Sequence, residues 1–244
     1  MRRQALAVGV ALLTVITACT SSGSAATATS SPAATISPTR MPDAVRAAAH
    51  EAATREPFSW HSKHVTARSL GKSWHEGCPV GPKELRALHM TFWGFDHTTH
   101  HGTLIARARA VPTYVAAFHK MYRHEFPIRR MRPVSVYGGD DNVSMRHDNT
   151  SAFNCRYAVS DGPKHWSMHA YGEAVDINTV ENPYYLNGRV RPKKGEPYMD
   201  RSNKRPGMIT PGSVPVRAFT DLGWGWGGNW SSSPDYQHFS STGG

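Results

Sequence analysis

Two side chains that could bind a metal ion stand close together in the segment from Trp166 to Asn178. His169 and Asp176 are seven positions apart, and Gly172 lies between them. On a single strand these two side chains would point to opposite faces, because side chains alternate along a strand. A chain reversal at Gly172 would instead place them on neighbouring antiparallel strands, where they can converge. We therefore expect a strand-to-strand turn at this glycine.

A third side chain that could complete this pair lies near the C-terminus. Catalytic zinc sites use three protein ligands drawn from His, Asp and Glu, and they leave a further position open. His238 can supply the third ligand, and Asp235 can accept a proton from a water molecule that the metal activates. The chain contains 14 histidines, so chance also produces such spacing. Spacing alone leaves a site without metal as an alternative.

The other histidines are interpreted as surface or core residues. Two of them, His100 and His101, precede an apolar stretch in what we expect to be the start of a strand, which argues against a ligand role. The set interpreted in this way includes His97, His100, His101 and His147. The metal hypothesis therefore rests on the two C-terminal segments alone.

The elements expected around these residues are short and mixed in type. The clearest helix spans residues 112–125, and Pro127 prevents its continuation. Its apolar stripe at helical spacing consists of Val111, Val115, Phe118 and Tyr122. Strands are expected at Gly102–Ile105, Val134–Tyr137 and Glu173–Ile177. This order favours a small α+β domain over an alternating βαβ sheet.

The N-terminal residues predict export. Arg2 and Arg3 precede an apolar run from Ala5 to Ala18, which is too short to cross a hydrocarbon core of ~30 Å comfortably. The run ends in Ile16-Thr17-Ala18-Cys19, which resembles the lipobox of bacterial lipoproteins. That resemblance implies a lipid on Cys19 and a location on the outer face of the cell membrane, facing the wall. Plain secretion with an unmodified Cys19 is the alternative.

Composition divides the chain into four segments. Residues 1–18 are predicted to be the signal peptide. Residues 19–41 are rich in Ser, Thr, Ala and Pro, a composition that favours a disordered tether. Residues 42–70 are expected to form a short helical or extended lead-in. Residues 71–244 hold most of the apolar and aromatic residues and are expected to form the globular domain.

The charge of the chain favours an anionic partner. The sequence has 28 Lys and Arg against 18 Asp and Glu, which gives a formal net charge of +10. Such a chain attracts polyanions without specifying which one. Export and the lack of a recognisable nucleic-acid-binding motif argue against nucleic acid. We therefore assign the charge to polymers of the cell envelope.

Two cysteines remain beyond Cys19. Cys78 and Cys155 can pair outside the cytosol, and a bridge that closes so long a loop would add about 4 kcal/mol to stability. The sequence leaves open whether the two residues meet.

The segment from Ser167 to Asp176 resembles a known family signature. The signature Ser-x-His-x-x-Gly-x-Ala-x-Asp belongs to the zinc D-alanyl-D-alanine carboxypeptidase and L-alanyl-D-glutamate endopeptidase family. Every fixed position is matched, by Ser167, His169, Gly172, Ala174 and Asp176. Further similar segments are Trp93–Asp96, Phe126–Ile128, Asn149–Arg156, Asn182–Tyr184 and Gly223–Gly228. The resemblance covers residues 71–239.

This resemblance implies a fold, a cofactor and roles for individual residues. The fold would be an α+β domain of the hedgehog and DD-peptidase type, in which a central antiparallel sheet carries the zinc site. Zn²⁺ would be bound by His169, Asp176 and His238. Asp235 would be the catalytic carboxylate, and Ser167 would line the substrate site.

The family also uses an arginine to hold a carboxylate or carbonyl oxygen of the substrate, which suits the guanidinium fork. Arg156 is the preferred match because it belongs to the similar segment from Asn149. Arg146 is the alternative. Either arginine could instead pair with Asp140 or Asp141.

The identity of one acid bears on the substrate. Carboxypeptidase branches of the family carry Glu where this chain has Asp235, whereas Asp resembles the endopeptidase branch. The resemblance therefore implies hydrolysis of peptidoglycan stem peptides, at L-Ala-D-Glu or D-Ala-D-Ala, with a preference for cutting within the peptide. The alternative is a non-catalytic wall-binding lipoprotein that keeps the metal fold. We expect a monomer that reaches the membrane through its lipid and binds no nucleic acid.

Overall fold

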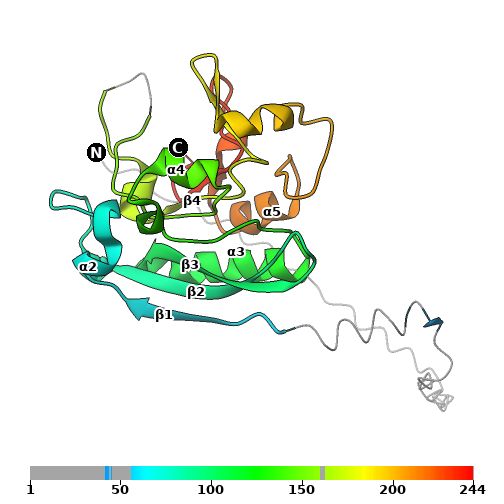
Figure 1. Ribbon diagram of the computed structural model, residues 1–244, viewed down its shortest axis with the longest axis horizontal. Helices are drawn as coiled ribbons and strands as arrows, with labels where there is room; N and C mark the ends of the chain where they lie inside the picture. Colours follow the sequence, from blue (N-terminus) through cyan, green and yellow to red (C-terminus); the bar gives the residue numbers. More distant parts are fainter. Residues whose placement is uncertain (1–41, 44, 46–55, 160–162, 244) are drawn as a thin grey trace, which may run out of the picture. The chain divides into compact units, whose positions relative to one another are not determined.

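The computed structural model describes residues 42–43, 45, 56–159 and 163–243. The chain divides into two compact units, Met1–Ala49 and His50–Gly244. All elements named below belong to the second unit (Figure 1). The predicted signal peptide, Cys19 and the tether lie outside the described residues. Within the described part of the chain, no helix has the length and apolar character needed to cross a membrane.

The second unit consists of short helices and strands. Its strands are β1 (Trp60–His64), β2 (Leu85–Trp93), β3 (Thr99–Arg107), β4 (Ala174–Asp176), β5 (Tyr184–Leu186), β6 (Arg189–Arg191), β7 (Gly225–Trp226) and β8 (His238–Ser240). Its α-helices are α2 (Ala67–Leu70), α3 (Val111–Arg123), α4 (Asp141–Arg146) and α5 (Val214–Thr220). The 3₁₀ turns are η2 (Gly71–Ser73), η3 (Pro82–Glu84), η4 (Ala108–Ala110), η5 (Val134–Tyr137), η6 (Met168–Tyr171), η7 (Lys193–Tyr198) and η8 (Gly227–Asn229).

The first sheet is antiparallel, with the strand order β1-β2-β3. Long strands β2 and β3 pair along their whole length, so that Leu88 lies opposite Leu104 in the core. Strand β1 pairs with β2 from Trp60 to His64. The folded unit therefore begins before the expected boundary at residue 71, because the backbone of β1 takes its hydrogen-bond partners from the edge of β2.

The second sheet is smaller and has the order β4-β8-β7. It joins a segment from the middle of the domain to the last residues of the chain, since β4 pairs with β8 in antiparallel register. Strands β5 and β6 form a separate two-stranded hairpin. Small antiparallel sheets combined with helices confirm the expected α+β class.

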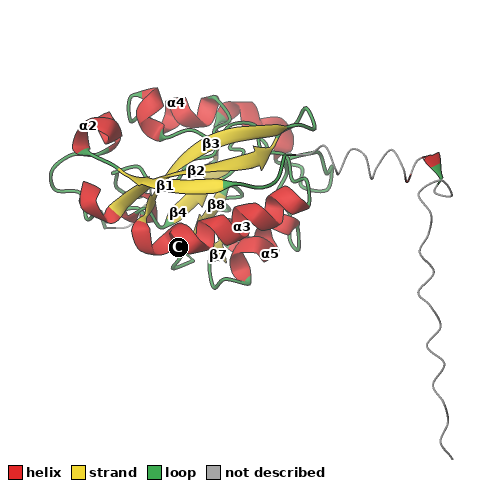
Figure 2. Cartoon of the chain, turned by 90° about the horizontal axis from the view of Figure 1, so that it is seen from below, coloured by secondary structure: helices red, strands yellow, loops and turns green. Residues whose placement is uncertain are grey.

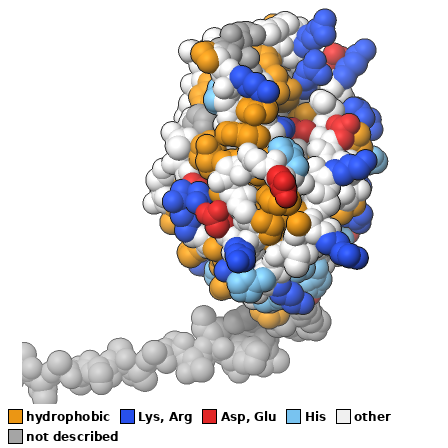
Figure 3. Space-filling view, turned by 90° about the vertical axis from the view of Figure 1, so that its left-hand side faces the viewer, with side chains coloured by type: hydrophobic (Ala, Val, Ile, Leu, Met, Phe, Trp, Pro, Cys, Tyr) orange, Lys and Arg blue, Asp and Glu red, His pale blue; other side chains and the backbone are white. Residues whose placement is uncertain are grey.

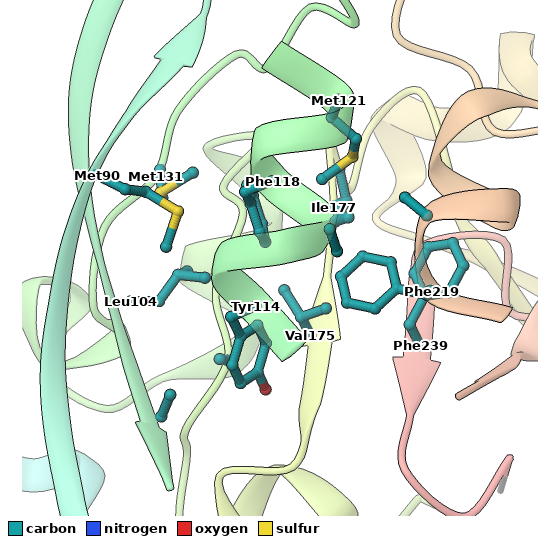
Figure 4. Close-up of a cluster of buried hydrophobic side chains, with 14 of the residues drawn as sticks. Met90, Leu104, Tyr114, Phe118, Met121, Met131, Val175, Ile177, Phe219 and Phe239 are labelled. Atoms are coloured by element: carbon teal, nitrogen blue, oxygen red, sulfur yellow. The ribbon is translucent and has the colours of Figure 1, made fainter. Parts of the chain in front are cut away.

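Helix α3 lies between the two sheets and forms the centre of the core. Figure 4 shows Tyr114 and Phe118 of α3 between Leu104 of β3 on one side and Phe219 and Phe239 on the other. Figure 2 shows α3 beside α5 beneath the first sheet. Tyr114 also donates a hydrogen bond of 2.9 Å to the carbonyl of Ala174 in β4. Truncating a side chain as buried as Phe118 costs about 3–5 kcal/mol.

The helix confirms the sequence prediction, and one expected strand is wrong. Helix α3 begins at Val111 and ends at Arg123, close to the expected 112–125. The segment Val134–Tyr137 forms the 3₁₀ turn η5 instead of a strand. Pro133 precedes this turn, and Gly138 closes it with a φ of 69°. Glycine adopts this left-handed conformation without a steric penalty, so the local turn prevails over the β-propensity of the two valines.

Candidate metal centre

The first expected ligand, His169, lies on a 3₁₀ turn. The hydroxyl of Ser167 accepts a hydrogen bond from the backbone N–H of His169 and so caps η6. Gly172 ends the turn with a φ of 69°, and a Cβ atom there would lie 2.7 Å from the backbone nitrogen of Arg107. The expectation that His169 and Asp176 occupy neighbouring strands is therefore wrong. Gly172 reverses the chain as predicted, but from a turn into β4.

The other two expected ligands are neighbours across the second sheet. Asp176 is the last residue of β4 and His238 is the first residue of β8, and the antiparallel register places them directly opposite each other. Side chains of directly opposed residues project from the same face of a sheet. The pairing therefore brings together two residues that are 62 positions apart in the sequence.

The potential donor atoms of these three residues form a small triangle. Nε2 of His169 lies 3.2 Å from Nδ1 of His238 and 3.2 Å from Oδ2 of Asp176. Nδ1 of His238 lies 3.1 Å from Oδ1 of Asp176. A tetrahedral zinc ion with bonds of about 2.0–2.1 Å would separate its ligand atoms by roughly 3.3–3.4 Å. The residues present thus fit a small divalent cation in size and donor type.

A hydrogen bond behind His169 fixes the ring in the orientation that a ligand needs. Nδ1 of His169 contacts the carbonyl oxygen of Ala152. Because a carbonyl oxygen only accepts, Nδ1 carries a hydrogen, and Nε2 is the ring nitrogen that faces Asp176 and His238. The backbone N–H of Ser151 bonds to the carbonyl of Asp176 at 3.0 Å, so the same segment supports a second ligand.

The three residues are buried and electrostatically matched to a cation. His169, Asp176 and His238 are 3%, 4% and 7% exposed. Burial alone would favour the neutral form of Asp176, but the two histidines outweigh it and hold the pKa of this carboxyl well below its usual range. Burial lowers the pKa of His169, but Asp176 more than offsets this, and the pKa is raised. The raised pKa means that, without a metal ion, His169 tends to carry a second proton. A metal ion would replace this proton as the positive charge that faces Asp176.

Asp235 lies beside these residues and lines the same cavity. A close approach of the backbone positions it, since a Cβ on Gly227 would meet the carbonyl oxygen of Asp235 at 2.7 Å. Its Oδ1 atom is buried without a hydrogen-bond partner among the described residues. Burial and the nearby charge of Asp176 raise the pKa of Asp235 to about 7. A carboxyl group with such a pKa can accept and release a proton near neutral pH.

Arg156, the preferred arginine, lines the cavity and forms an ion pair with the first residue of α4. Its Nη2 lies 2.8 Å from Oδ2 of Asp141. The ion pair with Asp141, which the sequence left open as an alternative for Arg156, is therefore present. Its Nε is buried without a partner among the described residues, so the guanidinium retains a free donor.

The structure does not bring Arg146 to this cavity. Arg146 is exposed on α4 and lines a separate pocket with residues 188–193. Of the two arginines, Arg156 lines the cavity of the potential ligands, and Arg146 lines the separate pocket. Ser167 does line the cavity, and it also caps the turn of His169.

The cavity has a volume of about 320 Å³ and aromatic walls. Residues that sequence analysis did not single out contribute to it, namely Met145, Trp166, Tyr184, Tyr185, Leu186, Trp230 and Gln237. The Oε1 atom of buried Gln237 has no hydrogen-bond partner among the described residues. Gln237 precedes His238 directly, and this adjacency was the one signal in the sequence that could have indicated it.

A disulfide links the N-terminal part of the domain to the segment behind the ligands. Cys78 and Cys155 are bonded, with their Cα atoms 5.9 Å apart. The pairing that the sequence left open is therefore present. His75 lies beside these cysteines, and the three residues form a further group of potential metal ligands. The disulfide, however, occupies both sulfur atoms. Among the described residues, the remaining group of this kind is His169, Asp176 and His238.

Comparisons with known proteins point to the same segment. A family model described as D-alanyl-D-alanine carboxypeptidase matches residues 160–241. No curated protein and no solved structure gives a match. The matched segment contains His169, Asp176, Asp235 and His238. The match therefore confirms the resemblance of this chain to the D-alanyl-D-alanine carboxypeptidase family.

Proposed function

We propose that this protein is an exported zinc peptidase that hydrolyses the stem peptides of bacterial peptidoglycan. The observation that carries the proposal is one cavity that contains both the triangle of buried donor atoms and the unpartnered carboxylate oxygen of Asp235. The family match supports a peptidase of the carboxypeptidase type, a class that uses a metal ion. The histidines and the aspartate present are ligands that suit zinc.

The residues around the cavity divide the work of peptide hydrolysis. A zinc ion held by His169, Asp176 and His238 would supply Lewis acidity toward the scissile carbonyl group and toward water. Asp235 would accept a proton from the attacking water and deliver it to the leaving amine. The raised pKa of Asp235 supports this role. A bound dication would lower that pKa, because it stabilises the carboxylate.

Arg156 would position the substrate. Its guanidinium is tied to Asp141 through Nη2, and the side chain lines the cavity that the peptide would enter. Charge-assisted hydrogen bonds from arginine to carboxylate or carbonyl oxygen are among the stronger polar contacts. Ser167 and the aromatic side chains Trp166 and Trp230 would form the walls against which the peptide lies.

The preferred bond is L-Ala-D-Glu, with D-Ala-D-Ala as the second choice. The aspartate at position 235 is one methylene shorter than the glutamate of the carboxypeptidase branches, so water and the scissile bond must lie differently. We further propose that a lipid on Cys19 and the tether of residues 19–41 hold a monomeric domain at the outer face of the membrane, within reach of the wall.

Digestion of purified peptidoglycan tests the proposed function. The full-length protein would be incubated with Zn²⁺ and peptidoglycan of several wall types, with and without a chelator, and the products identified by mass spectrometry. We expect products cut at L-Ala-D-Glu, or free D-alanine, that disappear when the chelator is present. No cleavage of any wall type by zinc-loaded protein would contradict the proposal.

A non-catalytic wall-binding lipoprotein that keeps the metal fold is the rival proposal. Such a protein needs the three ligands for its shape, but it does not need an acid at position 235. The buried and unpartnered Oδ1 of Asp235 is costly for stability, and a purely structural role leaves this cost without a purpose. The substitution of Asp235 described below separates the two proposals.

A further inference from the structure

We call the cavity that is lined by His169, Asp176 and His238 the metal-type cavity. A second pocket, with a cationic lining, adjoins it. It has a volume of about 410 Å³, and its lining includes four cations, namely Arg146, Arg189, Arg191 and Lys193. Glu196 is its one acidic lining residue. We call it the basic pocket. The excess of positive charge makes it suited to an anion.

The basic pocket and the metal-type cavity share their walls. Met145 of α4 lines both. The β5–β6 hairpin also contributes to both, because Tyr184–Leu186 face the metal-type cavity and Gly188–Arg191 line the basic pocket. Figure 3 shows Lys and Arg side chains gathered toward the upper right of one face of the molecule. A polymer that enters the cavity can therefore reach the basic pocket without leaving the surface.

The cations of the basic pocket lack acidic partners among the described residues. Elsewhere in the domain, arginines pair with carboxylates: Arg107 with Glu84, Arg129 with Asp148, Arg156 with Asp141. No such ion pair forms at Arg146, Arg189, Arg191 or Lys193 in the described part of the chain. Four positive charges around one pocket, with the single carboxylate of Glu196 among them, leave a net repulsion. This arrangement favours an external anion that would neutralise them.

We propose that the basic pocket binds an anionic group of the wall polymer, a carboxylate or a phosphate diester, outside the peptide segment that is cut. Guanidinium groups bind both kinds of oxyanion through paired hydrogen bonds. This inference rests on the proposed function for the identity of the polymer. The pocket would hold the polymer on the protein while the metal-type cavity acts on one of its peptides.

Sedimentation with purified wall sacculi measures this binding without turnover. The full-length protein and the variant Arg189→Glu/Lys193→Glu would be mixed with sacculi in the presence of a chelator, so that the wall is not digested. We expect the double variant to bind about tenfold more weakly or worse, because two charge-assisted contacts are replaced by repulsion. The difference should shrink at high salt, which screens exposed charges.

A matched variant controls for overall charge. Lys63→Glu/Arg123→Glu makes the same change in net charge at two exposed residues, on β1 and at the end of α3. This control should bind sacculi nearly as well as the unaltered protein. An equal loss of binding in both double variants, or no loss in either, would overturn the inference.

Two further arms identify the anion and separate the inference from the proposed function. If removal of phosphate polymers with hydrofluoric acid abolishes the difference between unaltered protein and pocket variant, the ligand is a phosphate diester. If the difference persists, it is a carboxylate. The pocket variant should cleave a short soluble stem peptide at the unaltered rate. Failure of the unaltered protein to cleave that peptide counts against the proposed function alone, because sedimentation does not depend on cleavage.

Discussion

The two three-stranded sheets of this protein both carry histidines, in different surroundings. In the first sheet, His61 of β1 stacks on His89 of β2, with ring centroids 4.7 Å apart, and His89 Nδ1 pairs with the hydroxyl of Thr103. These rings remain accessible to solvent and have no carboxylate between them. In the second sheet, His238 is buried opposite Asp176 and faces His169.

The difference teaches that the number of histidines does not define a metal site. The first sheet has more of them, but they do not converge: His89 pairs with the hydroxyl of Thr103, whereas His100 and His101 each contact a separate carboxylate, of Asp96 and Glu56. At the second sheet, Asp176 of β4 and His238 of β8 meet His169 of η6, so that two imidazole nitrogens and a carboxylate point at one place, and all three residues are buried. Convergence, burial and a compensating charge together favour a bound cation there.

The substitution with the largest expected effect removes one of the three potential metal ligands, His169. We expect His169→Ala to lose the bound zinc and all detectable peptidase activity, because the two remaining ligands cannot hold the ion in a closed geometry. Zinc would be measured by plasma mass spectrometry on the dialysed protein. Retention of one zinc per chain would show that the cluster is not the metal site.

The next test keeps the metal and removes the proposed base. Asp235→Asn preserves shape but cannot accept a proton, so we expect kcat to fall about 10²–10⁴-fold. Zinc content should stay at the level of the unaltered protein. Both quantities would be measured on the same preparation, with a stem peptide as substrate. Unchanged turnover would remove Asp235 from the mechanism and favour the wall-binding alternative.

The disulfide behind the ligands provides a test on stability. The double variant Cys78→Ser/Cys155→Ser removes the crosslink between two residues that are 77 positions apart in the sequence. The chain-entropy model predicts that the free energy of unfolding falls by about 4 kcal/mol. Urea denaturation followed by tryptophan fluorescence measures the change. A loss below about 1 kcal/mol would mean that packing, not the crosslink, holds this segment in place.

A second buried acid near β4 sharpens the comparison because it has no histidine beside it. Burial and the neighbouring Asp148 raise the pKa of Glu181 from its ordinary 4.5 to about 8. The folded state thus keeps a proton that the unfolded chain releases above pH 4.5, so the free energy of unfolding decreases as pH rises from 4.5 to about 8.

Replacement of this acid should remove that pH dependence. In Glu181→Gln the side chain no longer titrates, so the decline in stability over the same range should become shallower, by on the order of a few kcal/mol for the pKa difference involved. Urea denaturation at several pH values provides the measurement. An equally steep decline in the variant would assign the titration to another group.

The smallest expected effect concerns the histidines of the first sheet. His61→Ala/His89→Ala should retain the full zinc content, and activity should stay within about twofold, since substitutions of partly exposed side chains away from the site change little. This variant is the matched control for His169→Ala. Loss of zinc from it would break the comparison between the two sheets.

Local pattern was sufficient for much of the prediction. The spacing of His169, Gly172 and Asp176 indicated a chain reversal between two ligands, and the apolar stripe predicted α3. These features depend on contacts between residues close in sequence, and the geometry of one turn or one helix decides them. The strand predicted at Val134–Tyr137 is wrong because Pro133 and Gly138 favour a turn more strongly than the valines favour a strand.

The sequence by itself thus determined the residue types of the site, the helix and the α+β class. The tertiary structure decided that β8 pairs with β4 in the register that sets His238 against Asp176. It also decided that Arg156 joins the cavity while Arg146 lines the basic pocket. Pairings of this kind depend on long-range packing of α3 between two sheets, and no local spacing encodes that arrangement.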